Sequence, residues 1–156
     1  LDRIGFEFRR RFDGVDINKI LTVEASGIAV ACMTAPHFGY PPVVFAKKSV
    51  PSTMTEGFYK AEAKSFTKGT VSEFRVSESF LNESDKVLII DDFMAHGEAS
   101  MALLNIAKQA GAEVAGVGAV IEKGFQGGSS KIREAGCRVE SLVVIEKIEN
   151  GNITFA

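Results

Sequence analysis

The sequence contains few of the residues from which disulfide scaffolds and metal sites are built. It has two cysteines, Cys32 and Cys137, which lie far apart and form no CxxC motif, and two unaccompanied histidines, His37 and His96. Two distant thiols do not make a disulfide framework, and neither residue type has the spacing of a zinc site. We therefore expect two free thiols in a reducing compartment.

Excess charge and long apolar runs are also missing. The 18 basic and 20 acidic residues give a net charge of −2, whereas a nucleic-acid-binding domain usually carries a clustered positive surface. No apolar run approaches the length of a membrane span, and no signal peptide opens the chain. These absences predict a cytoplasmic protein that binds neither nucleic acid nor membrane. An anionic ligand would need a local loop, a helix end or a few lysines.

The chain does have enough apolar residues for one folded domain, because 46% of its 156 residues are hydrophobic. Short apolar runs alternate with helical patterns, which is typical of βαβ units. We expect an α/β fold with a mostly parallel twisted sheet flanked by helices, and ligands at the carboxyl ends of its strands. The expected strands are 19–23, 42–46, 86–91, 114–121 and 138–148, with a hairpin of 59–67 and 71–77 and an edge strand at 153–155. The expected helices are 2–12, 28–38 with an early end at Pro36, 99–110 and 129–135.

The most informative segment is 87–99, VLIIDDFMAHGEA, in which an apolar strand ends in Asp91 and Asp92. A short turn containing Gly97 follows, and then a helix begins. Unpaired amides and the dipole at a helix start favour a phosphate group, and glycine allows close backbone contact. Carboxylates repel phosphate, but they accept hydrogen bonds from hydroxyl groups and bind Mg²⁺. The segment therefore predicts a site for a sugar phosphate with a metal ion, although an ordinary strand-to-helix turn is the simpler alternative.

This segment resembles the phosphoribosyl pyrophosphate motif of the type I phosphoribosyltransferases. The resemblance implies that Asp91 and Asp92 are the catalytic pair that holds the ribose hydroxyls and, directly or indirectly, Mg²⁺. It also implies that backbone amides of a five-residue loop wrap the 5′-phosphate: Ala95, His96, Gly97, Glu98 and Ala99.

Three positions of this loop depart from the family pattern. Many members have threonine where His96 stands and a smaller residue where Glu98 stands. Because Glu98 is acidic and lies beside the expected phosphate, its side chain must point away from that phosphate. Some purine-specific members carry an acid, proposed to take the base proton, at the position of Ala95. Alanine cannot take a proton, so either another group serves or the base enters already ionised.

Two further strand ends carry groups suited to an anion. The segment 23–29, VEASGIA, is again a strand, a small-residue loop and a helix, although a serine that caps a helix is common. In the resembled family the corresponding loop, here Ala25, Ser26 and Gly27, binds pyrophosphate. Lys47 and Lys48 follow the strand VVFA at the same sheet edge, where their charges would neutralise pyrophosphate. A solvated charge pair is the alternative for Lys47 and Lys48. Residues 49–57 fall where the family has a loop that closes over the reaction.

A base site is indicated after the strand GVGAVI, where Lys123 and Phe125 follow. The motifs VEASGIA, VVFAKK, SFTK, VLIIDDFMAHGEA and VIEKGFQ, in this order, resemble the bacterial branch of the family that acts on xanthine. The resemblance implies that Lys123 contacts the base. An ammonium donates to the 6-oxo group and N7 of an oxopurine, whereas adenine would set donor against donor. Phe125 is either a stacking partner for the purine or a core residue.

The resemblance implies one phosphoribosyltransferase domain over 1–156 that transfers the phosphoribosyl group from phosphoribosyl pyrophosphate to N9 of a 6-oxopurine, with xanthine favoured. It also implies Mg²⁺ as cofactor, a homodimer, and an N-terminal hood segment that precedes Leu1 in the family and is absent here. No residue above explains selection at C2 of xanthine. Two alternatives stay open: a regulator like the purine-operon repressors, which binds phosphoribosyl pyrophosphate without catalysis, and a transferase for hypoxanthine, guanine or adenine.

Overall fold

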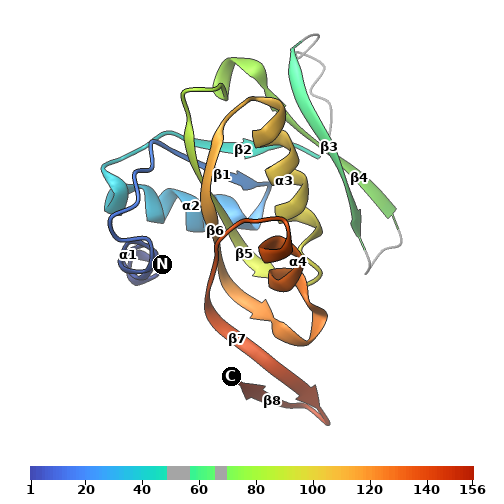
Figure 1. The fold of residues 1–156 in the computed structure, drawn as a ribbon. Coiled ribbons are helices and arrows are strands. Elements are labelled where there is room, and N and C mark those ends of the chain that lie inside the picture. The colour runs from blue at the N-terminus through green and yellow to red at the C-terminus, as the bar shows by residue number, and fades with distance from the viewer. Residues whose placement is uncertain (49–56, 66–69) are drawn as a thin grey trace.

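A six-stranded sheet forms the centre of the molecule in the computed structural model, which describes residues 1–48, 57–65 and 70–156 (Figure 1). The strand order is β2-β1-β5-β6-β7-β8, and every pairing is parallel except that of β8 with β7. The strands are β1 (Lys19–Val23), β2 (Val43–Ala46), β5 (Lys86–Met94), β6 (Glu113–Lys123), β7 (Val139–Glu149) and β8 (Asn152–Phe155). The predicted α/β architecture with a mostly parallel sheet is therefore confirmed.

Helices cover both faces of this sheet, as Figure 1 shows. They are α1 (Asp2–Arg11), α2 (Ser26–Thr34), α3 (Glu98–Gln109) and α4 (Gly128–Glu134), with short 3₁₀ turns η1 (Ala35–Phe38), η2 (Glu78–Phe80) and η3 (Gly124–Gln126). Pro36 ends the second helix early, as predicted. None of the helices in the described ranges is long and apolar enough to cross a membrane.

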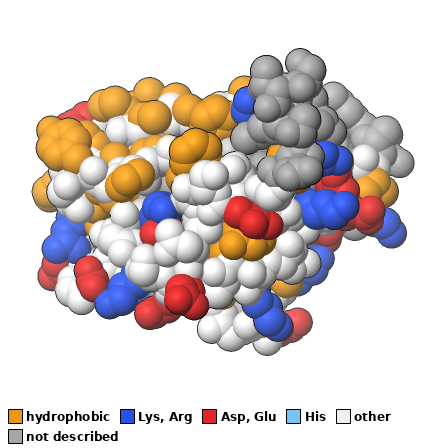
Figure 2. Space-filling view, turned by 90° about the horizontal axis from the view of Figure 1, so that it is seen from above, with side chains coloured by type: hydrophobic (Ala, Val, Ile, Leu, Met, Phe, Trp, Pro, Cys, Tyr) orange, Lys and Arg blue, Asp and Glu red, His pale blue; other side chains and the backbone are white. Residues whose placement is uncertain are grey.

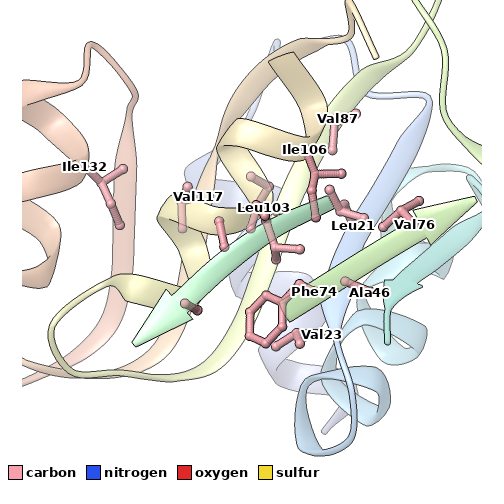
Figure 3. Close-up of a cluster of buried hydrophobic side chains, with 14 of the residues drawn as sticks. Leu21, Val23, Ala46, Phe74, Val76, Val87, Leu103, Ile106, Val117 and Ile132 are labelled. Atoms are coloured by element: carbon pink, nitrogen blue, oxygen red, sulfur yellow. The ribbon is translucent and has the colours of Figure 1, made fainter. Parts of the chain in front are cut away.

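The side chains of β5 alternate between two buried clusters because successive residues of a strand point to opposite faces. Leu88 and Ile90 pack with Phe8 of α1 in one cluster. Ile89 packs with Leu103 of α3 in the other, part of which Figure 3 shows. The central strand is thus buried on both faces, which explains its continuous apolar run.

A two-stranded antiparallel hairpin, β3 (Phe58–Ser65) and β4 (Thr70–Ser77), lies against α3. Ala61 and Phe74 join the α3 cluster, and the backbones of Lys47 and Arg75 exchange hydrogen bonds of 2.9 and 3.0 Å. These bonds attach the hairpin to the end of β2. The predicted closing segment, 49–57, and the predicted hairpin turn, 68–70, lie almost entirely outside the described residues.

Two strand ends were predicted too short. β5 was expected to end at Asp91 but continues to Met94, with Phe93 paired to Ile121. β6 was expected to end at Ile121 but continues to Lys123. Each strand supplies hydrogen-bond partners for the other beyond its apolar run, so the ladder extends into polar sequence. Consequently Asp91, Asp92 and Lys123 lie on the sheet itself and are held more rigidly than loop residues would be.

Candidate active site

The loop after β1 and the carboxylates of β5 meet at the carboxyl edge of the sheet. The Ser26 hydroxyl, in the first turn of α2, donates a hydrogen bond of 3.0 Å to Asp92 Oδ1. β1 and β5 are adjacent parallel strands, so both loops emerge on the same side. The structure therefore brings together the segments that the sequence assigned to pyrophosphate and to the ribose hydroxyls.

The two aspartates differ in exposure. Asp91 is 7% exposed, whereas Asp92 is half-buried. Burial raises the pKa of Asp91 to about 7, and the neighbouring charge of Asp92 adds to the rise. Burial destabilises the ionised form of this carboxyl, so it would gain from hydroxyl donors or a cation brought by a ligand.

The loop of residues 95–99 has the geometry of a phosphate cradle. Gly97 takes a left-handed φ of +72° and caps α3, so the helix begins directly after it. By helix geometry, the amides of Glu98, Ala99 and Ser100 precede the first intrahelical bond, which runs from Met101 N to Gly97 O at 2.9 Å. These amides are suited to an anion.

The start of α4 packs directly on this loop. A Cβ atom on Gly128 would lie 2.5 Å from Ala95 O and 2.7 Å from Gly97 N, so only glycine allows the approach. The Glu98 carboxylate forms an ion pair with Lys131 of α4. The acidic side chain that the sequence flagged is therefore directed toward α4. Sequence reasoning missed Gly128 and Lys131 because nothing local relates them to residues some thirty positions earlier.

The Glu24 carboxylate, at the start of the loop predicted to bind pyrophosphate, accepts a hydrogen bond of 2.6 Å from Lys48 N. Lys47 is half-buried directly after β2 and lines a groove between β2 and β4. Among the described residues its ammonium has no recorded hydrogen bond or ion pair, and its role toward pyrophosphate stays a prediction.

The side of the site that was predicted to bind the base contains an aromatic residue, Phe93, that the sequence analysis did not single out. Lys123 Nζ lies 5.1 Å from the centroid of the Phe93 ring, which is 40% exposed. Phe93 pairs with Ile121 and Lys123 is two residues further along β6, so both side chains lie on the same face. The signal was present, because Phe93 directly follows the aspartate pair, but it was interpreted as part of a turn. Phe125 is 52% exposed in η3 with no ring contact recorded in the described residues, and its role stays a prediction.

Glu122, the residue before Lys123, is a buried carboxylate that was also missed. It is 3% exposed and accepts hydrogen bonds from the hydroxyls of Ser129 in α4 and, at 2.5 Å, Ser141 in β7. Neighbouring residues of a strand point to opposite faces, so Glu122 anchors α4 on one face while Lys123 projects on the other.

Within the described ranges, no three His, Cys, Asp or Glu side chains gather to form a metal site. Two adjacent carboxylates beside a loop predicted to bind pyrophosphate nevertheless fit Mg²⁺, which is usually held by one or two carboxylates together with substrate phosphates and water.

The fold matches that of solved phosphoribosyltransferases. An adenine phosphoribosyltransferase from Giardia lamblia, complexed with 9-deazaadenine, superposes with a TM-score of 0.83 over 94% of this chain and 80% of that chain, at 19% sequence identity. The mostly parallel sheet flanked by helices thus has the type I phosphoribosyltransferase fold.

Relatives in sequence show to which branch of the phosphoribosyltransferases the chain belongs. Xanthine phosphoribosyltransferase of Clostridium novyi is 52% identical over 155 residues, which cover 99% of this chain and 81% of the relative. Xanthine phosphoribosyltransferase 2 of Clostridium botulinum (strain Langeland) is 49% identical over 154 residues, with the same coverage of 99% and 81%. No protein-family model matches the chain. Because these relatives are identical at about half of the positions over nearly the whole chain, the chain belongs to the xanthine phosphoribosyltransferase family.

Proposed function

We propose that the protein transfers the 5-phosphoribosyl group from phosphoribosyl pyrophosphate to N9 of xanthine, giving xanthosine 5′-monophosphate and pyrophosphate in purine salvage. The observation that carries this proposal is the Ser26–Asp92 hydrogen bond, because it unites the pyrophosphate loop and the aspartate pair in one site. The names of the relatives at about half sequence identity support xanthine as the base and catalysis over a regulatory role.

Each part of phosphoribosyl pyrophosphate has a matching group in this site. Amides at the start of α3 donate to the 5′-phosphate, and those of Ser26 and Gly27 donate to the pyrophosphate. Asp91 and Asp92 accept hydrogen bonds from the ribose hydroxyls. When bound, Mg²⁺ supplies positive charge that favours departure of the pyrophosphate. The protein's contribution is mainly to position the reactants and to stabilise positive charge at the ribose C1 atom.

Lys123 and Phe93 form the proposed base site. The ammonium donates to the 6-oxo group of the purine, while the exposed Phe93 ring offers an apolar wall. The 5.1 Å contact between Nζ and this ring restrains the lysine by a cation–π interaction, typically worth about 0.5–1 kcal/mol. Adenine would present an amino donor to the same ammonium, so we expect it to be rejected.

We expect Lys123→Met to raise the KM for xanthine about tenfold or more and to leave the KM for phosphoribosyl pyrophosphate within about twofold. The substitution keeps the apolar stem but removes a hydrogen bond from a charged donor, which is worth about 1.5–3 kcal/mol. Steady-state kinetics with each substrate varied in turn measures both constants. Lys147→Met, which removes an exposed lysine paired to Glu149 on β7, is the matched control. An unchanged KM for xanthine would remove Lys123 from the base site.

A panel of bases tests the function directly. Purified protein with Mg²⁺ and phosphoribosyl pyrophosphate is given xanthine, guanine, hypoxanthine or adenine, and release of pyrophosphate is followed. We expect the highest kcat/KM with xanthine, background rates with adenine, and loss of turnover when a chelator removes the metal. Binding of phosphoribosyl pyrophosphate without turnover of any base would instead support the repressor-like regulator.

We also propose that the protein is a cytoplasmic homodimer, as the family resemblance implies. Figure 2 shows hydrophobic side chains gathered along one side of the face seen there, with charged side chains spread over the rest. Tyr40, Phe45 and Phe80 are among the exposed large apolar side chains, and the last two line the groove between β2 and β4. Light scattering on the purified protein measures its mass in solution, and a monomer would contradict the dimer.

A further inference from the structure

An acidic residue stands at the position where the proposed 5′-phosphate binds. Glu98 is the first residue of α3, directly after the glycine cap Gly97. A carboxylate in the first helical turn is favourable for the helix itself, because it complements the positive end of the dipole. The same positive end is what attracts phosphate, so a freely moving carboxylate would compete with the ligand and repel it.

Lys131 holds this carboxylate in the structure. Its ammonium pairs with Glu98 Oε1 across the gap between α4 and α3, and the Glu98 side chain is only 24% exposed. The pair lies in the wall of a groove of about 840 Å³, which also contains Glu62 and Lys108. Lys108 forms no ion pair with any residue that the structure describes, so the groove supplies a matched lysine outside the pair.

The position of Lys131 is set by contacts of α4 with the rest of the site. Gly128 packs against the backbone of Ala95 and Gly97, and Ser129 donates to the buried Glu122 carboxylate. The first turn of α4 is therefore attached both to the phosphate loop and to the strand that carries Lys123. This attachment keeps the ammonium next to Glu98.

We propose that Lys131 is a positioning residue for phosphoribosyl pyrophosphate, and that it acts by holding the Glu98 carboxylate away from the 5′-phosphate. The proposal rests on the proposed function of the site. It adds that tight binding of phosphoribosyl pyrophosphate requires the Glu98–Lys131 ion pair. Lys131 does not touch the substrate in this scheme. Its effect passes entirely through Glu98, which is what separates it from a lysine that simply attracts phosphate.

The decisive variant is Lys131→Met. We expect the Kd and KM for phosphoribosyl pyrophosphate to rise about tenfold, because a released carboxylate repels the 5′-phosphate. At saturating phosphoribosyl pyrophosphate, kcat and the KM for xanthine should stay within about twofold, since the base site is not altered. Lys108→Met should leave all these constants unchanged. Lys131→Arg, which preserves the ion pair, should restore most of the affinity.

A double variant identifies the route of the effect. Glu98→Gln removes the negative charge beside the 5′-phosphate. Adding Lys131→Met to this variant should therefore change the affinity for phosphoribosyl pyrophosphate by less than about twofold. If Lys131→Met costs as much in the Glu98→Gln background as in the wild type, Lys131 acts as a cation for phosphate and the proposal is overturned. An unchanged affinity in the single variant also overturns it. Thermal denaturation of each variant checks that the fold is kept.

Calorimetric titration with phosphoribosyl pyrophosphate and Mg²⁺ measures the affinity without turnover. A wild-type protein that binds this ligand but converts no base would refute the proposed function and still allow the test of Lys131. A wild-type protein that does not bind it would refute both. Normal wild-type turnover with no effect of Lys131→Met would refute the inference alone.

Discussion

Asp92→Asn should lower kcat about 100-fold or more while the protein stays folded. Asp92 accepts the Ser26 hydroxyl at 3.0 Å and is only half-buried, so it is accessible to a ligand. Asparagine has the same shape and can still accept from Ser26, but it loses the negative charge and turns a donor toward the ribose hydroxyls. Removing one such electrostatic group from an active site typically costs about 10²–10³ in kcat.

Steady-state kinetics with xanthine measures the loss, and circular dichroism with thermal denaturation reports on the fold. Asp16→Asn is a matched control: its carboxylate pairs with Lys86 at 2.7 Å, at the beginning of β5 and therefore at the opposite end of the strand from Asp92. We expect Asp16→Asn to keep full activity. Near-normal turnover in Asp92→Asn would show that this carboxylate does not serve the reaction.

Much of the fold could be predicted because its signals are local. The bounds of β1 follow from a short apolar run, and the alternation of βα units implies a parallel sheet with helices on both faces. Pro36 marks the early end of the second helix because its ring cannot continue it. The meeting of Ser26 and Asp92 could be expected as well, since neighbouring parallel strands end at the same edge.

The missed features depend on partners that are distant in the chain. The extension of β5 past its apolar run requires β6 beside it, and no pattern within residues 86–94 reveals that partner. The same is true of the ring of Phe93 next to Lys123, and of Glu122 with its two serines. Burying a glutamate is unfavourable unless hydrogen-bond donors surround it. Composition and periodicity do not show the two serines, so they predict an exposed Glu122, whereas the fold buries it.

Asp91→Asn should stabilise the metal-free protein at pH 8 while it abolishes most of the activity. The pKa of Asp91 is raised from 3.8 to about 7 by burial, so the folded state binds its proton more tightly than the unfolded chain does. The contribution of Asp91 to the free energy of unfolding is therefore greatest below about pH 4. This contribution falls as the pH rises to about 7 and is constant above that. A difference of about 3 pH units corresponds to about 4 kcal/mol, which is the upper limit of the gain expected for asparagine.

Urea denaturation of both proteins between pH 4 and pH 8, with EDTA present, measures this gain. The advantage of Asp91→Asn should be largest at pH 8 and should shrink steadily toward pH 4, whereas Asp16→Asn should show no such trend. A constant or absent advantage would mean that burial of the Asp91 charge does not limit stability. In a parallel series without EDTA, addition of phosphoribosyl pyrophosphate with Mg²⁺ should stabilise the wild type more than the variant. Hydroxyl donors and a cation interact favourably with the buried Asp91 carboxylate but only weakly with a neutral amide. The charge that destabilises the free protein would then be the one that binds the substrate.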